Sequence, residues 1–179
     1  RRVSGGALSG IPTGFLDLDK ILVGLQPGEL TIIAARPSVG KTLFGLNIAS
    51  NVARQERSVL FVSLEQTRAQ ICERLLAAEA KVNSFKIRTG KLNSQEMDDL
   101  VDAGARMRQW QFRIDDTSAK VISAIEAHAK NLKRRIGLDA VFIDYLQLIH
   151  PDDRRIARYE QLGQISGRLK AIAKTLKIP

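Results

Sequence analysis

Cysteine is almost absent from this sequence, since Cys72 is the single example among 179 residues. One cysteine can form neither an internal disulfide nor a zinc site built from several thiolates, so chemistry of these two kinds is excluded. Cys72 lies within the apolar helical pattern of residues 68–81. We therefore expect it to be a buried and unreactive thiol.

Long apolar runs are missing as well. No stretch approaches the roughly 20 residues that a helix needs to cross a bilayer. Residues 1–6 also lack the apolar segment of a signal peptide. These absences predict a cytoplasmic protein that has no membrane partner.

The rest of the composition is that of one ordinary globular domain. Apolar residues make up 44% of the chain and charged residues 26%, which is the balance of a chain that folds. A length of 179 residues corresponds to one domain. We expect a single domain over residues 1–179 and no second domain.

Positive charge is unevenly distributed. Much of the net charge of +9 falls in residues 154–179, where seven basic residues accompany one acidic residue. Such an excess favours a polyanionic partner such as nucleic acid, a nucleotide or acidic lipid. A solvated helix face is the alternative explanation of the same pattern.

Apolar periodicity predicts alternating strands and helices. Short runs rich in β-branched residues predict strands at residues 30–35, 58–63, 112–114 and 140–143. Helical spacing predicts helices at residues 15–22, 42–55, 68–81, 94–109, 122–136 and 162–176. A strand, a helix and a second strand within about 30 residues form a βαβ unit. The predicted fold class is therefore α/β with a mostly parallel sheet, and residues 83–93 are the most flexible-looking internal stretch.

A phosphate-binding loop is the most informative motif. Residues 35–42 (ARPSVGKT) match the pattern G-x-x-x-x-G-K-[ST], except that Ala35 replaces the first glycine. Backbone N–H groups of such a loop converge on phosphates at a helix N-terminus. Lys41 would reach the β- and γ-phosphates of ATP, and the Thr42 hydroxyl would ligate Mg²⁺. The residues expected to bind nucleotide here are Ala35, Arg36, Pro37, Ser38, Val39, Gly40, Lys41 and Thr42.

Two acidic residues follow predicted strands. Asp144 comes directly after the strand at 140–143, and Glu65 follows the strand at 58–63. Because parallel strands end at one edge of the sheet, both carboxylates should face the same crevice. Asp144 has the position of a Walker B aspartate that holds Mg²⁺ through water, and Glu65 that of a general base or water-orienting residue. With the phosphate-binding loop they predict ATP hydrolysis, although a structural cap between strand and helix is the alternative role for each.

Several sequence blocks together resemble one family. Five blocks are spread over nearly the whole chain and occur in the order SGIPTGFxDLD, ARPSVGKT, FVSLE, FIDYLQLI and RLKAIAK. In this order they resemble the ATPase domain of DnaB-type replicative DNA helicases. The resemblance implies a RecA-like P-loop fold with helices on both faces of the sheet. It also implies a hexameric ring with ATP between identical subunits, translocation on single-stranded DNA, and primase and a helicase loader as partners in a primosome.

The resemblance assigns roles at the nucleotide site. Lys41 and Thr42 match the family's phosphate and magnesium residues, Glu65 its catalytic glutamate and Asp144 its Walker B aspartate. Arg74, nine residues after Glu65, matches an arginine of the family's nucleotide site. An arginine on a helix surface is the alternative for Arg74.

The resemblance also suggests a DNA contact. Arg154, Arg155 and Arg158 fall near a loop that faces the central channel in the family. Basic side chains there would follow phosphates without reading bases, so binding would tolerate any sequence and weaken with salt. A solvated surface is the alternative.

The sequence departs from the family pattern at its end. The family continues beyond Ile178 and Pro179 with a core strand that bears a sensor glutamine, a DNA-contacting loop and a strand that supplies an arginine finger. The resemblance therefore implies a domain incomplete at its C-terminal end, without its last strands, and poor activity of this stretch alone.

Two other functions share parts of this pattern. A RecA-like recombinase or DNA-repair ATPase has the same loop and both carboxylates, but the blocks IDYLQL and RLKAIAK favour the helicase. A non-catalytic, nucleotide-dependent binding module is the other alternative. Glu65 argues against that module, which does not need a water-orienting acid.

Overall fold

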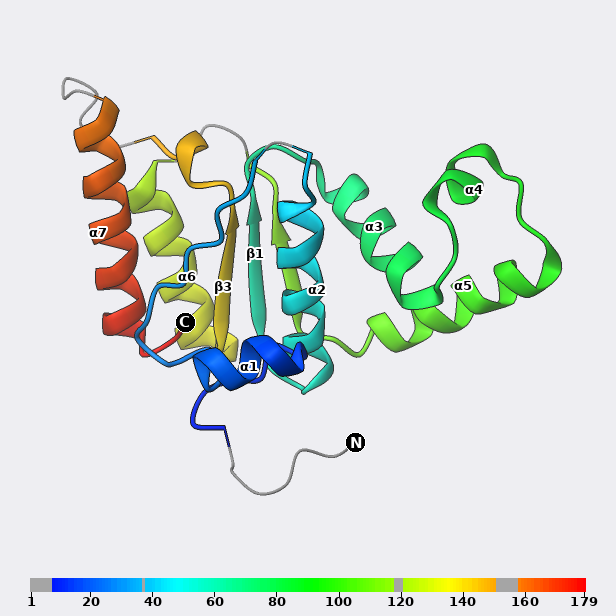
Figure 1. Cartoon of the computed structure of the whole chain (residues 1–179), viewed down its shortest axis with the longest axis horizontal. Coiled ribbons are helices and arrows are strands. Elements are labelled where there is room, and N and C mark those ends of the chain that lie inside the picture. The colour runs from blue at the N-terminus through cyan, green and yellow to red at the C-terminus, as the bar shows by residue number, and fades with distance from the viewer. Residues whose placement is uncertain (1–7, 37, 118–120, 151–157) are drawn as a thin grey trace.

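Three parallel strands form the centre of the molecule (Figure 1). The computed structural model describes residues 8–36, 38–117, 121–150 and 158–179. The strands are β1 (Val59–Ser63), β2 (Phe112–Asp115) and β3 (Ala140–Asp144). Their order is β2-β1-β3, and Val59 pairs with Phe112 on one side and with Ala140 on the other. The parallel sheet of the prediction is confirmed.

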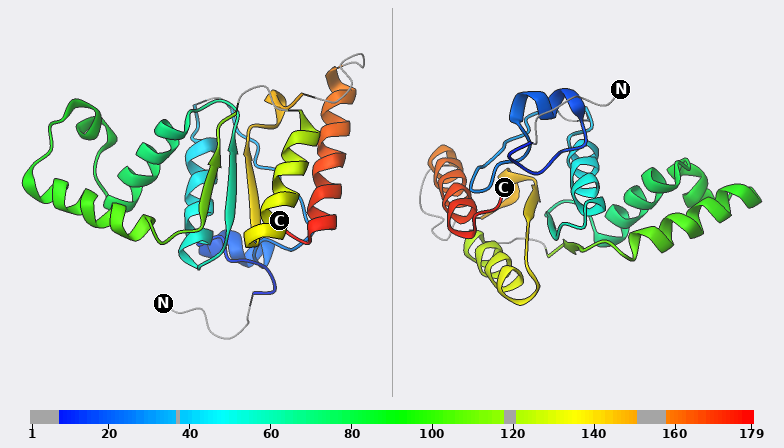
Figure 2. Two further views of the ribbon diagram at one scale, coloured as in Figure 1. Left: turned by 180° about the vertical axis from the view of Figure 1, so that it is seen from behind. Right: turned by 90° about the horizontal axis from the view of Figure 1, so that it is seen from below.

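Helices cover both faces of this sheet, as expected (Figure 2). They are α1 (Leu16–Leu22), α2 (Lys41–Arg54), α3 (Arg68–Ala80), α4 (Ser84–Thr89), α5 (Ser94–Met107), α6 (Ile122–Ile136) and α7 (Arg158–Leu176), with a short 3-10 helix at Leu146–Leu148. Helix α2 packs on one face, where Ile71 and Leu75 of α3 join its core from the side, and α6 and α7 pack on the other. Among the described residues, every helix is too short or too polar to cross a lipid bilayer.

The middle strand explains why the sheet needs two helical layers. Val59 and Phe61 belong to the apolar core under α2, whereas Leu60 and Val62 belong to the core under α6 and α7. All five residues of β1 are buried. A strand that is buried on both faces carries apolar residues without alternation, which is the pattern of the sequence VLFV.

Helices α3, α4 and α5 form an arm that projects from one side of the sheet (Figure 1). A small core inside the arm contains Ala80, Val82, Leu100 and Ala103. Helix α4 lies within residues 83–93, the stretch predicted to be the most flexible. The helix begins there because the Asn83 side chain accepts a hydrogen bond from the backbone of the first turn.

The predicted strand at residues 30–35 does not form. This segment runs alongside β3, but a cavity of about 650 Å³ lies between the two. Ile32 is 64% exposed. On this edge of β3 the Val141 N–H donates instead to the Pro179 carbonyl oxygen, at 3.1 Å. The β-branched run has a strand's composition, but it makes no ladder of hydrogen bonds with β3, because propensity alone does not supply a paired neighbour.

Cys72 also departs from the prediction, since it is exposed rather than buried. Ile71 and Leu75 are the residues of α3 that face the core, and Cys72 lies about 100° around the helix from Ile71. Desolvation by the surrounding protein nevertheless raises the pKa of the Cys72 thiol. A raised pKa keeps the thiol protonated and therefore weakly reactive.

Candidate nucleotide site

Three of the predicted site residues meet at the carboxyl end of β3. Lys41 and Thr42 begin helix α2, and Asp144 ends β3. The Thr42 hydroxyl donates to Asp144 Oδ2 at 2.6 Å, and Lys41 Nζ lies 3.6 Å from Asp144 Oδ1. Each carboxylate oxygen of the buried Asp144 is thus engaged by one residue of the phosphate-binding loop.

The backbone of the loop suits an anion. Gly40 precedes α2 with a left-handed φ of 101°, and Ser38 also has a positive φ, of 64°. Ala35 is not among the positive-φ residues, so alanine fits at the position of the motif's first glycine. Among the described residues no side chain caps α2, and the first turn of this helix contains no acidic residue. The N–H groups at this helix end can therefore receive a phosphate. Pro37 lies outside the described residues.

Tyr145 completes the surroundings of Lys41, and the sequence did not single it out. Lys41 Nζ lies 4.1 Å from the centroid of the Tyr145 ring, which is the geometry of a cation–π contact. In the sequence, Tyr145 stands directly after Asp144 and within the block FIDYLQLI, but neither observation gives it a role. Two consecutive residues of one strand end thus contact the same ammonium group.

Glu65 reaches the same edge of the sheet from β1. Ser63 pairs with Asp144 in register, and the Leu64 N–H donates to the Asp144 carbonyl oxygen at 2.8 Å. Glu65 follows in an exposed turn. Within the described parts of the chain, no hydrogen bond or ion pair engages its carboxylate. The structure therefore places Glu65 beside Asp144 along the edge without joining it to Lys41 or Thr42.

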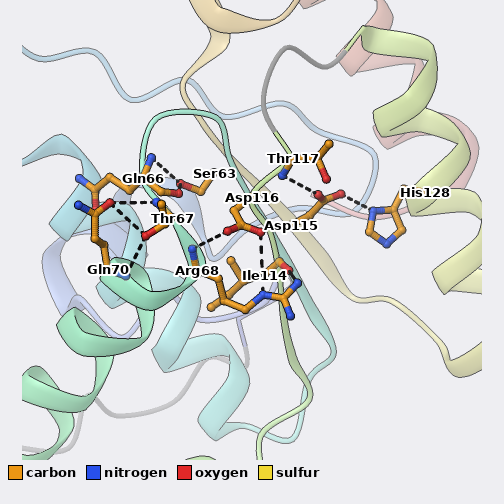
Figure 3. A network of polar contacts seen from close by, with 10 residues as sticks. All are labelled: Ser63, Gln66, Thr67, Arg68, Gln70, Ile114, Asp115, Asp116, Thr117 and His128. Carbon is orange, nitrogen blue, oxygen red and sulfur yellow. Dashed lines mark hydrogen bonds and ion pairs between the residues drawn. The ribbon is translucent and has the colours of Figure 1, made fainter.

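Hydrogen bonds hold the turn that carries Glu65 (Figure 3). The buried Ser63 hydroxyl accepts from the Gln66 N–H at 3.2 Å and donates to the Gln66 carbonyl oxygen at 2.7 Å. Thr67 and Gln70 then form a capping box at the start of α3. The turn is thereby closed on both sides of Glu65.

The end of β2 adds a second set of contacts to this edge (Figure 3). Asp116 accepts from the Arg68 N–H at 2.8 Å, and the Arg68 guanidinium donates to the Ile114 carbonyl oxygen at 3.0 Å. The hydrogen bond from the Arg68 backbone is the main cause that lowers the pKa of Asp116. The neighbouring Asp115 is buried and pairs with His128 Nδ1 of α6 at 2.6 Å. These residues tie β2 to α3 and α6.

The remaining predicted residues are not brought to the loop by contacts. Arg74 lies half-buried on α3, and its buried Nε has no hydrogen-bond partner among the described residues. Arg154 and Arg155 lie outside the described residues, and Arg158 is described only as the first residue of α7.

The oxygen atoms at the site fit a magnesium ion. Mg²⁺ prefers hard oxygen ligands and is usually held by one or two carboxylates together with substrate phosphates. The Thr42 hydroxyl and the Asp144 carboxylate are oxygen ligands 2.6 Å apart. They lie on the wall of the 650 Å³ cavity, beside Lys41.

Comparison with known proteins shows close relatives over almost the whole chain. The family model for the DnaB-like helicase C terminal domain matches residues 10–179. The chain is 43% identical over 176 residues to the replicative DNA helicase DnaC of Bacillus subtilis, and the match covers 97% of this chain and 39% of that protein. The replicative DNA helicase DnaB of Geobacillus stearothermophilus is similar to the same extent.

Solved structures share the fold. A structure of a DnaB-like replicative helicase and its interactions with primase matches with a TM-score of 0.92 and 32% identity, over 97% of this chain and 42% of that chain. The ATPase domain of G40P gives the same score and identity, over 62% of that chain. The chain spans about two-fifths of the length of the curated relatives that it matches.

Proposed function

The chain belongs to the family of DnaB-like helicase C-terminal domains, and from this premise we propose that it is the ATP-driven motor of a replicative DNA helicase. In this proposal, hydrolysis of MgATP drives translocation on single-stranded DNA and unwinding of the duplex. The observation that carries the proposal is the convergence of Lys41 and Thr42 on Asp144.

Phosphate binding is the proposed role of the loop at residues 35–42. The uncapped N-terminus of α2 offers backbone N–H groups, and Lys41 adds a positive charge. Thr42 and Asp144 would hold Mg²⁺, which neutralises charge on the β- and γ-phosphate oxygens when it is bound. The hydrogen bond between Thr42 and Asp144 would have to break when these two residues hold the metal.

Glu65 is proposed to orient the attacking water. Its carboxylate is exposed and unengaged among the described residues, and its turn is held by Ser63 and Thr67. A carboxylate at a fixed place on the edge of the sheet can accept a proton from water as the water attacks. The Arg74 Nε, which has no hydrogen-bond partner in the part of the chain that the structure describes, supports a proposal that this guanidinium also serves the nucleotide site.

The wider assembly is proposed from the family alone. Identical subunits would form a hexameric ring with ATP at their interfaces, in the cytoplasm, with primase and a loader as partners. Arg154, Arg155 and Arg158 would contact the phosphates of single-stranded DNA. Such contacts weaken steeply as the salt concentration rises.

The test uses the full-length protein. We expect magnesium-dependent ATP hydrolysis that single-stranded DNA accelerates, and unwinding of a forked duplex. Thr42→Val, which keeps the shape of the side chain but removes its hydroxyl, should abolish both. Hydrolysis that single-stranded DNA does not change, or strand exchange without unwinding, would contradict the helicase proposal.

A further inference from the structure

We propose that Tyr145 is a positioning residue of the nucleotide site: its ring holds the Lys41 ammonium in place for the phosphates. The inference rests on the proposed function and goes beyond it, because it adds a residue with an aromatic rather than a polar contact. It starts from the 4.1 Å that separates Lys41 Nζ from the ring centroid.

Lys41 needs such a restraint. Its side chain is 31% exposed and lies on the wall of the large cavity beside β3. A lysine has a flexible stem of four carbons, so an unrestrained ammonium would sample many positions over this opening. Ordering it when a nucleotide binds would cost conformational entropy.

The carboxylate of Asp144 cannot supply the restraint alone. It lies 3.6 Å from Lys41 Nζ, but its other oxygen accepts the Thr42 hydroxyl. In the proposed nucleotide complex the same carboxylate would help to hold Mg²⁺. The positive charge of the metal would then weaken the attraction between this carboxylate and the Lys41 ammonium. A carboxylate that stayed on Lys41 would also compete with the phosphates for the ammonium.

The ring of Tyr145 has neither drawback. It attracts the ammonium through its π face, so it takes up no oxygen ligand that the metal requires and does not bind the ammonium as strongly as a carboxylate would. Tyr145 follows Asp144 directly at the end of β3, and β3 is paired with β1 along its whole length. The backbone that carries the ring is thus held next to the sheet, and the ring reaches Lys41 through only two side-chain torsions, whereas the Lys41 ammonium stands at the end of a long flexible stem on α2.

A graded experiment tests the contact in the full-length protein. Isothermal titration calorimetry would measure the Kd for the magnesium complex of a non-hydrolysable ATP analogue. Tyr145→Leu should raise the Kd by about three- to tenfold, and Tyr145→Phe, which keeps a π face, should leave it within about twofold of the original. An equal rise for both variants would overturn the proposal, because it would assign the effect to the phenolic hydroxyl.

Fluorinated phenylalanines at position 145 make the test independent of folding. Successive fluorine atoms weaken the π face while keeping the shape of the ring, so the Kd should rise stepwise with fluorine number. The matched control is fluorinated phenylalanine at Phe85, which is 66% exposed on the distant arm; it should leave the Kd unchanged. A flat series at position 145 would overturn the inference about Tyr145 while the proposed function stands. Failure of the unaltered protein to bind the nucleotide would instead overturn the proposed function.

Discussion

Thr42 and Asp144 lie 102 positions apart in the sequence, and the Thr42 hydroxyl donates a hydrogen bond of 2.6 Å to the Asp144 carboxylate. The bond joins the start of α2 to the end of β3. It brings together a hydroxyl and a carboxylate that are both suited to magnesium, at a place where Lys41 is also present. The first prediction concerns this carboxylate.

Asp144→Asn should lower the rate of ATP hydrolysis in the full-length protein by about 10²–10³-fold, because it removes a preorganised charge from the site. A matched control is Asp139→Asn. Asp139 lies just before the opposite end of β3, where it accepts from the Ser58 N–H at 2.8 Å. The control should cost some stability but leave hydrolysis per folded molecule unchanged. Comparable rates for the two variants would contradict the role of Asp144.

Glu65→Gln should preserve nucleotide binding and abolish turnover. The carboxylate is exposed and makes no contact among the described residues that stabilises the fold, so the melting temperature should remain unchanged. Calorimetry measures the binding, and phosphate release measures the turnover. Glu56→Gln, a substitution of an exposed residue at the other end of β1, is the control. Normal turnover of the Glu65 variant would show that this residue does not orient water.

Glu79 joins the projecting arm to the rest of the protein, and it makes stability depend on pH. Burial of Glu79 opposes its ionisation, but hydrogen bonds from Arg54 of α2 and Arg106 of α5 outweigh burial and lower its pKa below the ordinary value of 4.5. A lowered pKa contributes stability above pH 4.5, and this contribution is lost as the pH falls through the pKa of the folded state.

The melting temperatures of Glu79→Gln and of the unaltered protein should differ by an amount that depends on pH. At pH 7 Glu79→Gln should melt about 2–4 °C below the unaltered protein. The difference should shrink as the pH falls below 4.5, because both proteins then carry a neutral side chain at this position. Glu29→Gln, which changes an exposed carboxylate, should show no such convergence. A difference in melting temperature that grows as the pH falls would contradict this role of the Glu79 carboxylate.

Asp116→Ala should loosen the start of α3. The change removes the hydrogen-bond acceptor of the Arg68 N–H and the ion-pair partner of the Arg68 guanidinium, so the first turn of α3 should open more often. Hydrogen exchange should accelerate several-fold at Arg68 and little in the middle of α2. Uniform acceleration across both helices would show global destabilisation instead of a local effect.

The sequence predicted those features that depend on neighbouring residues. The apolar pattern of α6 followed by Gly137 predicted a helix that ends there, and Gly137 indeed follows its last residue with a φ of 82°. The loop and the helix around Lys41 were predicted from the motif and its flanks, whereas the strand predicted before the loop does not form. The approach of Lys41 and Thr42 to Asp144 was expected because parallel strands end at one edge.

Features that depend on distant partners could not be predicted in this way. Residues 30–35 have a strand's composition, but a strand requires hydrogen bonds to a neighbour that composition does not specify. The exposure of Cys72 depends on which side of α3 meets the core. Neighbouring positions of a helix point about 100° apart, so Ile71 is buried whereas Cys72 is exposed. The contact of Tyr145 with Lys41 joins two elements far apart in sequence, so only the fold reveals it.

The strand order β2-β1-β3 has a consequence for how fast the chain folds. The middle strand comes first in the sequence, and its pairing with β3 begins at Val59 and Ala140, next to a hydrogen bond that joins Ser58 to Asp139 across 81 positions. Such pairings of high contact order form slowly. The arm, by contrast, has capping boxes at the starts of both α3 and α5, which are signals local in sequence. We therefore expect the arm to gain structure early in refolding, and the β1–β3 edge that carries Asp144 to close in the rate-limiting step.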